Sequence, residues 1–266
     1  GAGPSGSVAA GLLRKQGRQV MILEREQFPR FSIGESLLPQ SMACIEAAGF
    51  LQDVIEAGFQ YKNGAAFVRG SRATAFDFRD KFSPGWGTTF QVQRADFDHV
   101  LAQAATKAGA DIRYRHQVIA VAVDGEQPAV DVISPEGETY RVSARCLLDA
   151  SGFGRTLPRL LDLETPSEFP VRGAFFTHIE DRTVPGSFDR NKILITVHPT
   201  YQDVWFWTIP FSNGRCSLGV VAELSRLEQY PGSEAERLQA LVAETPSLAG
   251  LLANAVWDTP VRKLTG

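Results

Sequence analysis

The chain has 266 residues, of which 44% are apolar and 21% are charged, a composition that predicts a globular protein with a substantial core. A net charge of −3 excludes the basic surface of a nucleic-acid-binding protein and a strong anchor for an anionic membrane. No apolar run is long enough to span a bilayer, and no basic segment followed by an apolar one marks a secretory leader.

The chain begins with GAGPSG, residues 1 to 6, which fits the pattern G-x-G-x-x-G and leads into an apolar stretch. Glycines permit a tight turn and let backbone N–H groups approach a pyrophosphate, at which the following helix points its positive end. Such a turn needs a strand to deliver the chain into it, so we expect that first strand to lie outside the numbered sequence.

The run QVMILERE, residues 19 to 26, predicts a buried strand that ends at Glu24, 21 residues after Gly3. An acidic residue at this distance is placed to accept hydrogen bonds from the ribose of a dinucleotide. A carboxylate there favours a free 2′-hydroxyl, so the sequence indicates FAD or NAD rather than NADP.

Two later segments bear on the choice between FAD and NAD. FPRFSIGESLLP, residues 28 to 39, is an irregular loop in which Glu35 or Ser36 could cap a helix that starts at Leu37. FQVQRADFDHVLAQAATKAGA, which follows later, predicts a strand and an amphipathic helix. Arg94 lies at their junction, where its guanidinium could reach a cofactor phosphate or ring, or form a salt bridge at the helix start.

Residues 112 to 152 predict a β-meander with turns at DGEQP and PEGE and a last strand that ends in LLDASG. That strand would deliver Asp149 to a second turn of small residues. Two such turns give a long dinucleotide two points of contact, which suits extended FAD better than NAD. The sequence therefore predicts a flavoprotein.

The second half of the chain predicts long antiparallel strands: RGAFFTHIE, KILITVHP, DVWFWTIPF and CSLGVVAE. Alternation along DVWFWTIP places Trp205 and Trp207 on one face and Phe206 on the other, and Pro210 ends the strand. Either both faces are buried in a core or one face lines a cavity.

The three cysteines, Cys44, Cys146 and Cys216, are odd in number and far apart, without the spacing of metal ligands. We therefore expect reduced thiols in a cytoplasmic protein and no bound metal.

GAGPSG, FPRFSIGESLLP, QRADFD, LLDASG and WFWTIP follow the order in which such motifs occur in FAD-dependent halogenases. The chain resembles that family over essentially its whole length, and WFWTIP fits the family's signature W-x-W-x-I-P. The loop FPRFSIGESLLP looks like the branch that acts on phenols and pyrroles, often tethered to a carrier protein. The resemblance implies an α/β fold (α+β overall) like that of p-hydroxybenzoate hydroxylase. Its parts would be a Rossmann-like FAD-binding domain and a large antiparallel or mixed β-sheet substrate domain.

The resemblance also implies cofactor contacts, position by position. The first glycine turn would contact the pyrophosphate, Glu24 the ribose and the backbone of Val118 the adenine, with the residue 28–39 loop near the flavin. The implied cofactor-binding residues are Ala2, Gly3, Ser5, Gly6, Glu24, Glu35, Ser36, Arg94 and Val118, to which the second turn adds Asp149.

In that family, reduced FAD from a separate flavin reductase reacts with oxygen and chloride or bromide, and hypohalous acid travels through a short tunnel to a lysine beside the aromatic substrate. The segment GFQYKNGAAFVRG resembles the family's segment around that lysine, which makes it Lys62. An ammonium can orient hypohalous acid, and burial would lower its pKa. Without the resemblance, Lys62 would be a solvated lysine on an edge strand. Trp205 and Trp207 would be tunnel walls that keep substrate from the flavin, and His178 would be a surface or core residue.

We expect a discontinuous FAD-binding domain of residues 1–59 and 90–165 and a β-sheet substrate domain of residues 60–89 and 166–266. The family also has a third FAD motif, whose backbone amides help to bind halide, and a helical C-terminal region. We expect these, with any carboxylate partner of Lys62, beyond Gly266 in a longer protein, because this chain alone would not make a complete halogenase.

Two other functions fit the same fold. One is a flavin-dependent aromatic monooxygenase, reductase or dehydrogenase, of which a single-component monooxygenase would oxidise NAD(P)H itself and need no halide. The other is a non-catalytic scaffold that has kept the fold.

Overall fold

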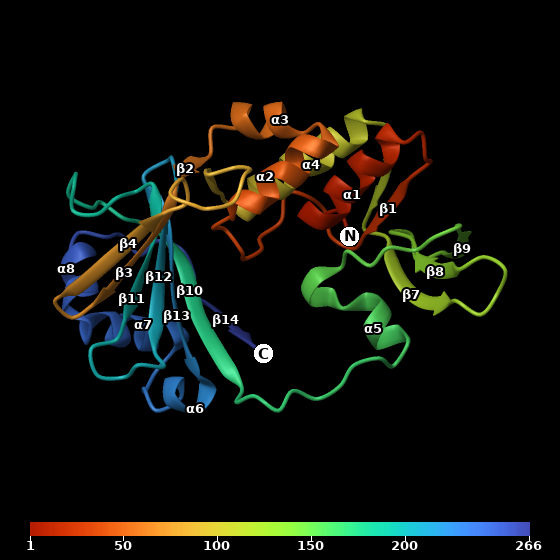
Figure 1. Cartoon of the computed structure of the whole chain (residues 1–266). Coiled ribbons are helices and arrows are strands. Elements are labelled where there is room, and N and C mark those ends of the chain that lie inside the picture. The colour runs from red at the N-terminus through yellow and green to blue at the C-terminus, as the bar shows by residue number, and fades with distance from the viewer. The chain divides into compact units, whose positions relative to one another are not determined.

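The computed structural model describes residues 1–266, and the chain divides into two compact units (Figure 1). Unit 1 comprises residues 1–34, 42–58 and 93–166, and unit 2 comprises residues 35–41, 59–92 and 167–266. No helix combines the length and the apolar character that crossing a membrane requires.

Unit 1 contains helices α1 and α4, which pack against each other, and the parallel strand pair of β1 and β6 (Figure 1). The predicted strand is present, and Glu24 ends it. Along α4, Phe97, Leu101, Ala104 and Ala105 are buried at helical spacing, as the amphipathic pattern predicts. The bounds are α1 (Pro4–Lys15), β1 (Met21–Glu24), α2 (Pro39–Ala48), α3 (Leu51–Glu56), α4 (Arg94–Lys107) and β6 (Asp111–Tyr114).

The rest of unit 1 is the predicted meander, a three-stranded antiparallel sheet in the order β7-β8-β9. A bulge between Val118 and Ala120 interrupts the pairing of β7 with β8. The strand predicted at LLDASG is wrong. Residues 146–150 have no hydrogen-bonded partner strand and form an irregular segment. The bounds are β7 (Gln117–Ala122), β8 (Ala129–Ile133), β9 (Thr139–Ser143), the 3-10 helix η1 (Gly152–Gly154) and α5 (Thr156–Leu160).

Unit 2 is dominated by a seven-stranded sheet in the order β14-β10-β13-β12-β11-β3-β4. The four strands predicted in the second half, β10 to β13, pair antiparallel as expected. Strand β3, from earlier in the chain, joins β11 in parallel, which makes the sheet mixed. The bounds are β3 (Gly64–Arg69), β4 (Arg72–Asp77), β10 (Arg172–Glu180), β11 (Lys192–Val197), β12 (Trp205–Pro210), β13 (Arg215–Glu223) and β14 (Arg262–Thr265).

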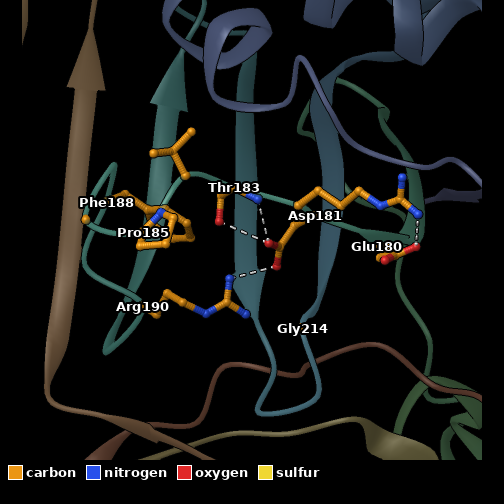
Figure 2. A pocket seen from close by; sticks show the side chains of 10 residues that line it. Glu180, Asp181, Thr183, Pro185, Phe188, Arg190 and Gly214 are labelled. Carbon is orange, nitrogen blue, oxygen red and sulfur yellow. Dashed lines mark hydrogen bonds and ion pairs between the residues drawn. The ribbon is translucent and has the colours of Figure 1, made fainter.

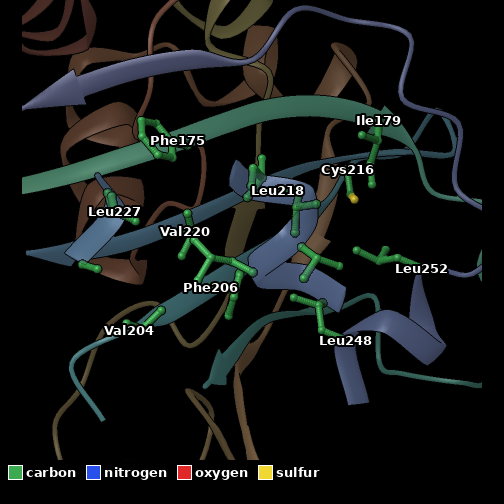
Figure 3. Packing of buried hydrophobic residues seen from close by; sticks show 14 residues of the cluster. Phe175, Ile179, Val204, Phe206, Cys216, Leu218, Val220, Leu227, Leu248 and Leu252 are labelled. Atoms are coloured by element: carbon green, nitrogen blue, oxygen red, sulfur yellow. The ribbon is translucent and has the colours of Figure 1, made fainter. Parts of the chain in front are cut away.

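One face of this sheet carries the apolar core of unit 2, closed by α6 (Leu224–Leu227), α7 (Glu234–Ala243) and α8 (Pro246–Leu251) (Figure 3). Phe206 is fully buried there, opposite Val220 of β13. Its neighbours Trp205 and Trp207 point to the other face of the sheet and are half-buried. The predicted alternation is confirmed, with Phe206 as the core residue.

A second, small sheet in unit 2 pairs β2 (Gln60–Lys62) with β5 (Thr89–Gln91), and places Lys62 opposite Thr89. Residues 35–37 lie along the other side of β5, where Ser36 forms a bridge with Gln91. The backbone N–H of Val92 donates to the carbonyl oxygen of Glu35 at 2.7 Å, and that of Leu37 donates to Phe90 at 3.1 Å. These two hydrogen bonds hold the segment in an extended conformation.

The predicted helix start at Leu37, capped by Glu35 or Ser36, is wrong. Helix α2 begins at Pro39. The backbone N–H of Leu37 donates to the carbonyl oxygen of Phe90 at 3.1 Å, so this residue belongs to the extended pairing with β5 and cannot also begin a helix.

Candidate functional site

The first turn of unit 1 leads into α1, whose N-terminus has no side-chain cap. Gly3 precedes the helix, no side chain caps α1, and its first turn holds no acidic residue. The unpaired N–H groups and the positive end of the helix dipole are therefore available to a phosphate.

The glycines of this turn serve different purposes. A Cβ on Gly1 would lie 2.7 Å from the carbonyl oxygen of Ala150, and one on Gly6 would overlap the carbonyl oxygen of Gly1, so the fold itself requires both glycines. A Cβ on Gly3 would meet nothing closer than Arg30 Nη2 at 3.5 Å. The fold itself would tolerate a Cβ at Gly3, so the close approach of a pyrophosphate to the backbone is the reason that remains for this glycine, and the turn fits a dinucleotide.

Glu24 ties this turn to the end of β1. Its buried carboxylate accepts hydrogen bonds from the backbone N–H of Ala2 at 2.7 Å and of Glu26 at 2.9 Å. Each carboxylate oxygen keeps a further lone pair, so Glu24 can still accept a ribose hydroxyl.

Replacing Glu24 with glutamine should weaken FAD binding about 10- to 100-fold, because one charged acceptor is lost from a buried site. Fluorescence titration of the full-length protein with FAD measures the effect. Glu26→Gln, which changes the exposed neighbouring carboxylate, is the matched control and should leave the affinity within about twofold. Equal affinities for Glu24→Gln and Glu26→Gln would remove Glu24 from the cofactor site.

Three other predicted contacts with FAD lie in the same unit. Asp149 accepts hydrogen bonds from the backbone N–H of Ser151 at 2.8 Å and of Leu157 at 2.9 Å, so it shapes the second turn. Val118 lies at the bulge of β7. Ser5 is in the first turn of α1. The contacts of these three residues with FAD stay predictions.

A buried carboxylate holds the start of α4. Asp98 is fully buried between two guanidinium groups, with Arg94 Nε at 2.7 Å and Arg30 Nη1 at 3.1 Å. The helix-start salt bridge, one of the two roles foreseen for Arg94, is present, and its contact with FAD stays a prediction. Sequence reasoning missed Arg30 and Asp98, although the i,i+4 spacing of Arg94 and Asp98 was a usable signal.

Glu35 faces His178 of β10. Its Oε1 lies 2.7 Å from His178 Nε2, and the carboxylate is buried. A buried carboxylate needs such a partner, and His178 provides it for Glu35. The two residues are 143 positions apart and share no motif, so no sequence signal could have paired them.

Lys62 is buried in unit 2, with 2% of its surface exposed, so the alternative of a solvated lysine is wrong. Its Nζ donates to the carbonyl oxygen of Leu37 at 2.7 Å and lies 5.1 Å from the centre of the Phe78 ring. No carboxylate forms a salt bridge with it, and burial lowers the pKa of Lys62 from 10.5 to about 8. Near pH 8 the amine is therefore about half neutral and able to act as a nucleophile.

The lowered pKa of Lys62 predicts a pH dependence of stability. Between about pH 8 and 10.5 the unfolded chain binds more protons at Lys62 than the folded chain, so its contribution to the free energy of unfolding rises with pH. Lys62→Met abolishes this contribution. Urea unfolding should show that the stability advantage of Lys62→Met over wild type shrinks by about 3 kcal/mol across this window. A difference that does not change with pH would mean that Lys62 titrates as an ordinary lysine.

Trp205 and Trp207 lie on the sheet face opposite the core, with ring centres 6.2 Å apart. Trp207 covers Gly219 of β13, where a Cβ would overlap its ring, and its Nε1 donates to Ser217 Oγ at 2.9 Å. Pro210 is the last residue of β12. The role of the two tryptophans as tunnel walls stays a prediction.

A cavity of about 400 Å³ lies at the end of β10 in unit 2, apart from the predicted site residues (Figure 2). The Asp181 carboxylate accepts hydrogen bonds from Arg190 Nη1 at 2.8 Å and from the hydroxyl of Thr183 at 3.0 Å. The polar groups of this cavity therefore satisfy one another.

Comparison with known proteins agrees with the dinucleotide geometry of unit 1. Residues 1–251 match the model of the family described as "FAD binding domain". The chain is 30% identical over 226 residues to the brominase of 1H-pyrrole-2-carbonyl-(peptidyl-carrier protein) from Pseudoalteromonas luteoviolacea, an alignment covering 83% of this chain and 53% of that enzyme. The chain spans about half the length of the curated relatives that it matches.

Solved structures give the same result. A flavoprotein/dehydrogenase from Cytophaga hutchinsonii is 42% identical with a TM-score of 0.94, covering 100% of this chain and 65% of that one. The myxobacterial chondrochloren halogenase is 31% identical with a TM-score of 0.86, covering 99% of this chain and 62% of that one. The predicted α/β fold with a mixed sheet is confirmed. The chain belongs to the family of FAD-binding domains, and its relatives include flavin-dependent halogenases.

Proposed function

We propose that this chain is the FAD-binding and β-sheet part of an FAD-dependent halogenase acting on an aromatic substrate. Unit 1 would hold FAD through the first glycine turn and Glu24, and unit 2 would supply the reactive lysine. The observation that carries the proposal is Lys62: an amine buried without a carboxylate partner, at the position that the halogenase resemblance selects.

When held by unit 1 and reduced, FAD would supply the chemistry that turns oxygen and chloride or bromide into hypohalous acid. Lys62 donates one N–H to Leu37 and has further N–H groups to donate to that acid. Its neutral form, well populated near pH 8, offers a lone pair to the electrophilic halogen. The Phe78 ring beside Nζ excludes water from one side of the amine and favours its charged form only weakly.

The tryptophans of β12 would act as walls rather than reagents. Trp207 is fixed by its contact with Gly219 and its hydrogen bond to Ser217, so its ring presents a rigid apolar surface. Such a surface can admit a halide-derived oxidant and keep an aromatic substrate away from the flavin.

The relatives support a substrate class and two partners. The brominase from Pseudoalteromonas luteoviolacea acts, by its name, on a pyrrole carried by a peptidyl carrier protein. We infer a phenol or pyrrole as the substrate, either free or on such a carrier, and a separate flavin reductase as the source of reduced FAD.

The test uses the full-length protein with FAD, a flavin reductase, NADH, oxygen, bromide and an electron-rich phenol. We expect a product with the two-isotope mass pattern of bromine, formed only when both bromide and the reductase are present. Omitting the reductase separates a halogenase from an enzyme that oxidises NADH itself. Product formed without bromide would sink the proposal.

A flavin-dependent dehydrogenase or reductase is the second candidate, favoured by the 42% identity to the flavoprotein/dehydrogenase from Cytophaga hutchinsonii. It would reduce or oxidise its substrate without halide and would have no need of a reactive Lys62. Rapid reduction of the bound FAD by NADH or by an organic substrate alone would favour this function.

A further inference from the structure

Three buried polar atoms without a hydrogen-bond partner gather in the small sheet of unit 2. They are the hydroxyls of Ser36 and Thr89 and the amide oxygen of Gln91. Thr89 and Gln91 are 2% and 1% exposed, and leaving such groups unpaired costs about 1–3 kcal/mol each. Unpaired buried polar atoms at one place indicate a polar ligand that satisfies them.

The strand register puts these atoms on the same side of the sheet as Lys62. Thr89 and Gln91 are two residues apart on β5, so their side chains share a face. Lys62 lies opposite Thr89, and Ser36 lies opposite Gln91. Directly opposed residues have Cβ atoms about 5 Å apart and diagonal ones about 7–8 Å, so one small molecule can reach all four side chains.

Lys62 spans this face. Its stem starts on β2, and its Nζ ends at the carbonyl oxygen of Leu37, the residue after Ser36 on the far side of β5. Gln91 is fixed at its other end, because its Nε2 donates to the carbonyl oxygen of Arg190 at 3.0 Å. The side-chain atom of Gln91 that has no hydrogen-bond partner is therefore the acceptor Oε1.

This set combines donors and an acceptor, which decides the kind of ligand. Lys62 and the two hydroxyls can donate, whereas Gln91 Oε1 can only accept. A bare halide would meet the partial negative charge of Gln91 Oε1, whereas a small molecule with a hydroxyl group satisfies both kinds of partner. Hypohalous acid is such a molecule.

We propose that Ser36, Thr89 and Gln91 form, with Lys62, a subsite that binds hypohalous acid by its hydroxyl group. The inference rests on the proposed halogenase function and adds three binding residues to it. Gln91 Oε1 accepts the O–H of the acid, and Lys62 and the Thr89 hydroxyl donate to the two lone pairs of its oxygen, with Ser36 at the edge of the subsite. The halogen atom is left free to meet the substrate.

The first test measures where the oxidant goes. Full-length wild type and the variant Thr89→Val receive reduced FAD, oxygen and bromide, with a phenol as substrate and a diketone in solution that traps escaped hypobromous acid. We expect the ratio of brominated phenol to brominated trap to fall about fivefold, since one hydrogen bond is lost, while flavin oxidation keeps its rate. Thr208→Val is the matched control, because Thr208 Oγ1 is equally buried and unpaired but lies on β12 of the large sheet.

The second test needs no catalysis and therefore separates the subsite from the proposed function. In the protein with lysine labelled at the side chain, NMR titration gives the pKa of Lys62, assigned with Lys62→Arg. Gln91→Glu should raise that pKa by about 1 or more, because a carboxylate would then face the amine. Thr89→Asp repeats the test if Gln91→Glu does not fold.

The outcomes are distinct. A raised pKa and a lowered product ratio support the subsite. An unchanged pKa in both acidic variants overturns the geometry. A raised pKa with an unchanged product ratio means a bound water only, and overturns the ligand assignment. If wild type makes no hypobromous acid, the proposed function fails, whatever the titration shows, and the ligand assignment fails with it.

Discussion

Lys62→Met should lower the rate of aromatic bromination by about 10²- to 10⁴-fold, the range found when a positioned acid–base group is removed. Methionine fills nearly the same volume, so the apolar wall at Phe78 is kept while the amine is lost. FAD affinity and the rate at which reduced flavin is consumed by oxygen should change little, because Lys62 is not among the residues that we expect to contact FAD. Single-turnover experiments with pre-reduced FAD separate the two rates.

The matched control is Lys81→Met. Lys81 also donates to backbone carbonyl groups, those of Gly85 and Trp86, but it is exposed. Its loss should leave bromination unchanged. If Lys62→Met brominated the phenol as fast as Lys81→Met, the lysine would have no chemical role and its burial would be a feature of packing alone.

Phe206→Ala should lower the free energy of unfolding by about 3–5 kcal/mol, the largest stability effect that we expect from a single substitution. Phe206 is fully buried among Val204, Leu218 and Val220, on the sheet face that α6 to α8 cover (Figure 3). Truncation removes the apolar area and leaves a cavity that the surrounding strands can close only in part. Urea unfolding of the full-length protein gives the difference.

Phe82→Ala makes the same chemical change at a fully exposed side chain and should cost less than about 0.5 kcal/mol. Similar losses for Phe206→Ala and Phe82→Ala would show that the core is not where the alternation of β12 puts it.

The sequence predicted the features whose physics is local. The glycine turn and the strand that ends at Glu24 depend on close backbone approach and hydrophobic patterning over about 25 residues. The alternation of Trp205, Phe206 and Trp207 follows from strand geometry alone. Rules about residues close together in the sequence were sufficient to predict each of these features.

Long-range pairings were beyond such rules. Residues 35–37 resemble a helix cap in sequence, yet they extend along β5. Glu35 pairs with the side chain of His178, and the backbone N–H of Leu37 donates to the carbonyl oxygen of Phe90. The segment at LLDASG has the apolar composition of a strand but no neighbour to pair with. Tertiary partners decided both, and neither partner can be read from the local sequence.

The site shows the same division. Lys62 could be selected only by resemblance, since nothing in QYKNG predicts that a lysine on a short edge strand is buried. Its unpaired polar neighbours come from two other segments of the chain, residues 35–37 and β5, and the strand register alone brings them together with Lys62.

The central claim is that a halogen atom, and not an oxygen atom, is transferred to the substrate. One reaction tests this claim most directly. The full-length protein, with reductase-supplied FAD, is given bromide and dioxygen labelled with heavy oxygen, and the phenol product is weighed by mass spectrometry. We predict a product that carries the two-isotope pattern of bromine and no heavy oxygen. A product that carries heavy oxygen and no bromine would contradict the halogenase and identify a monooxygenase on the same fold.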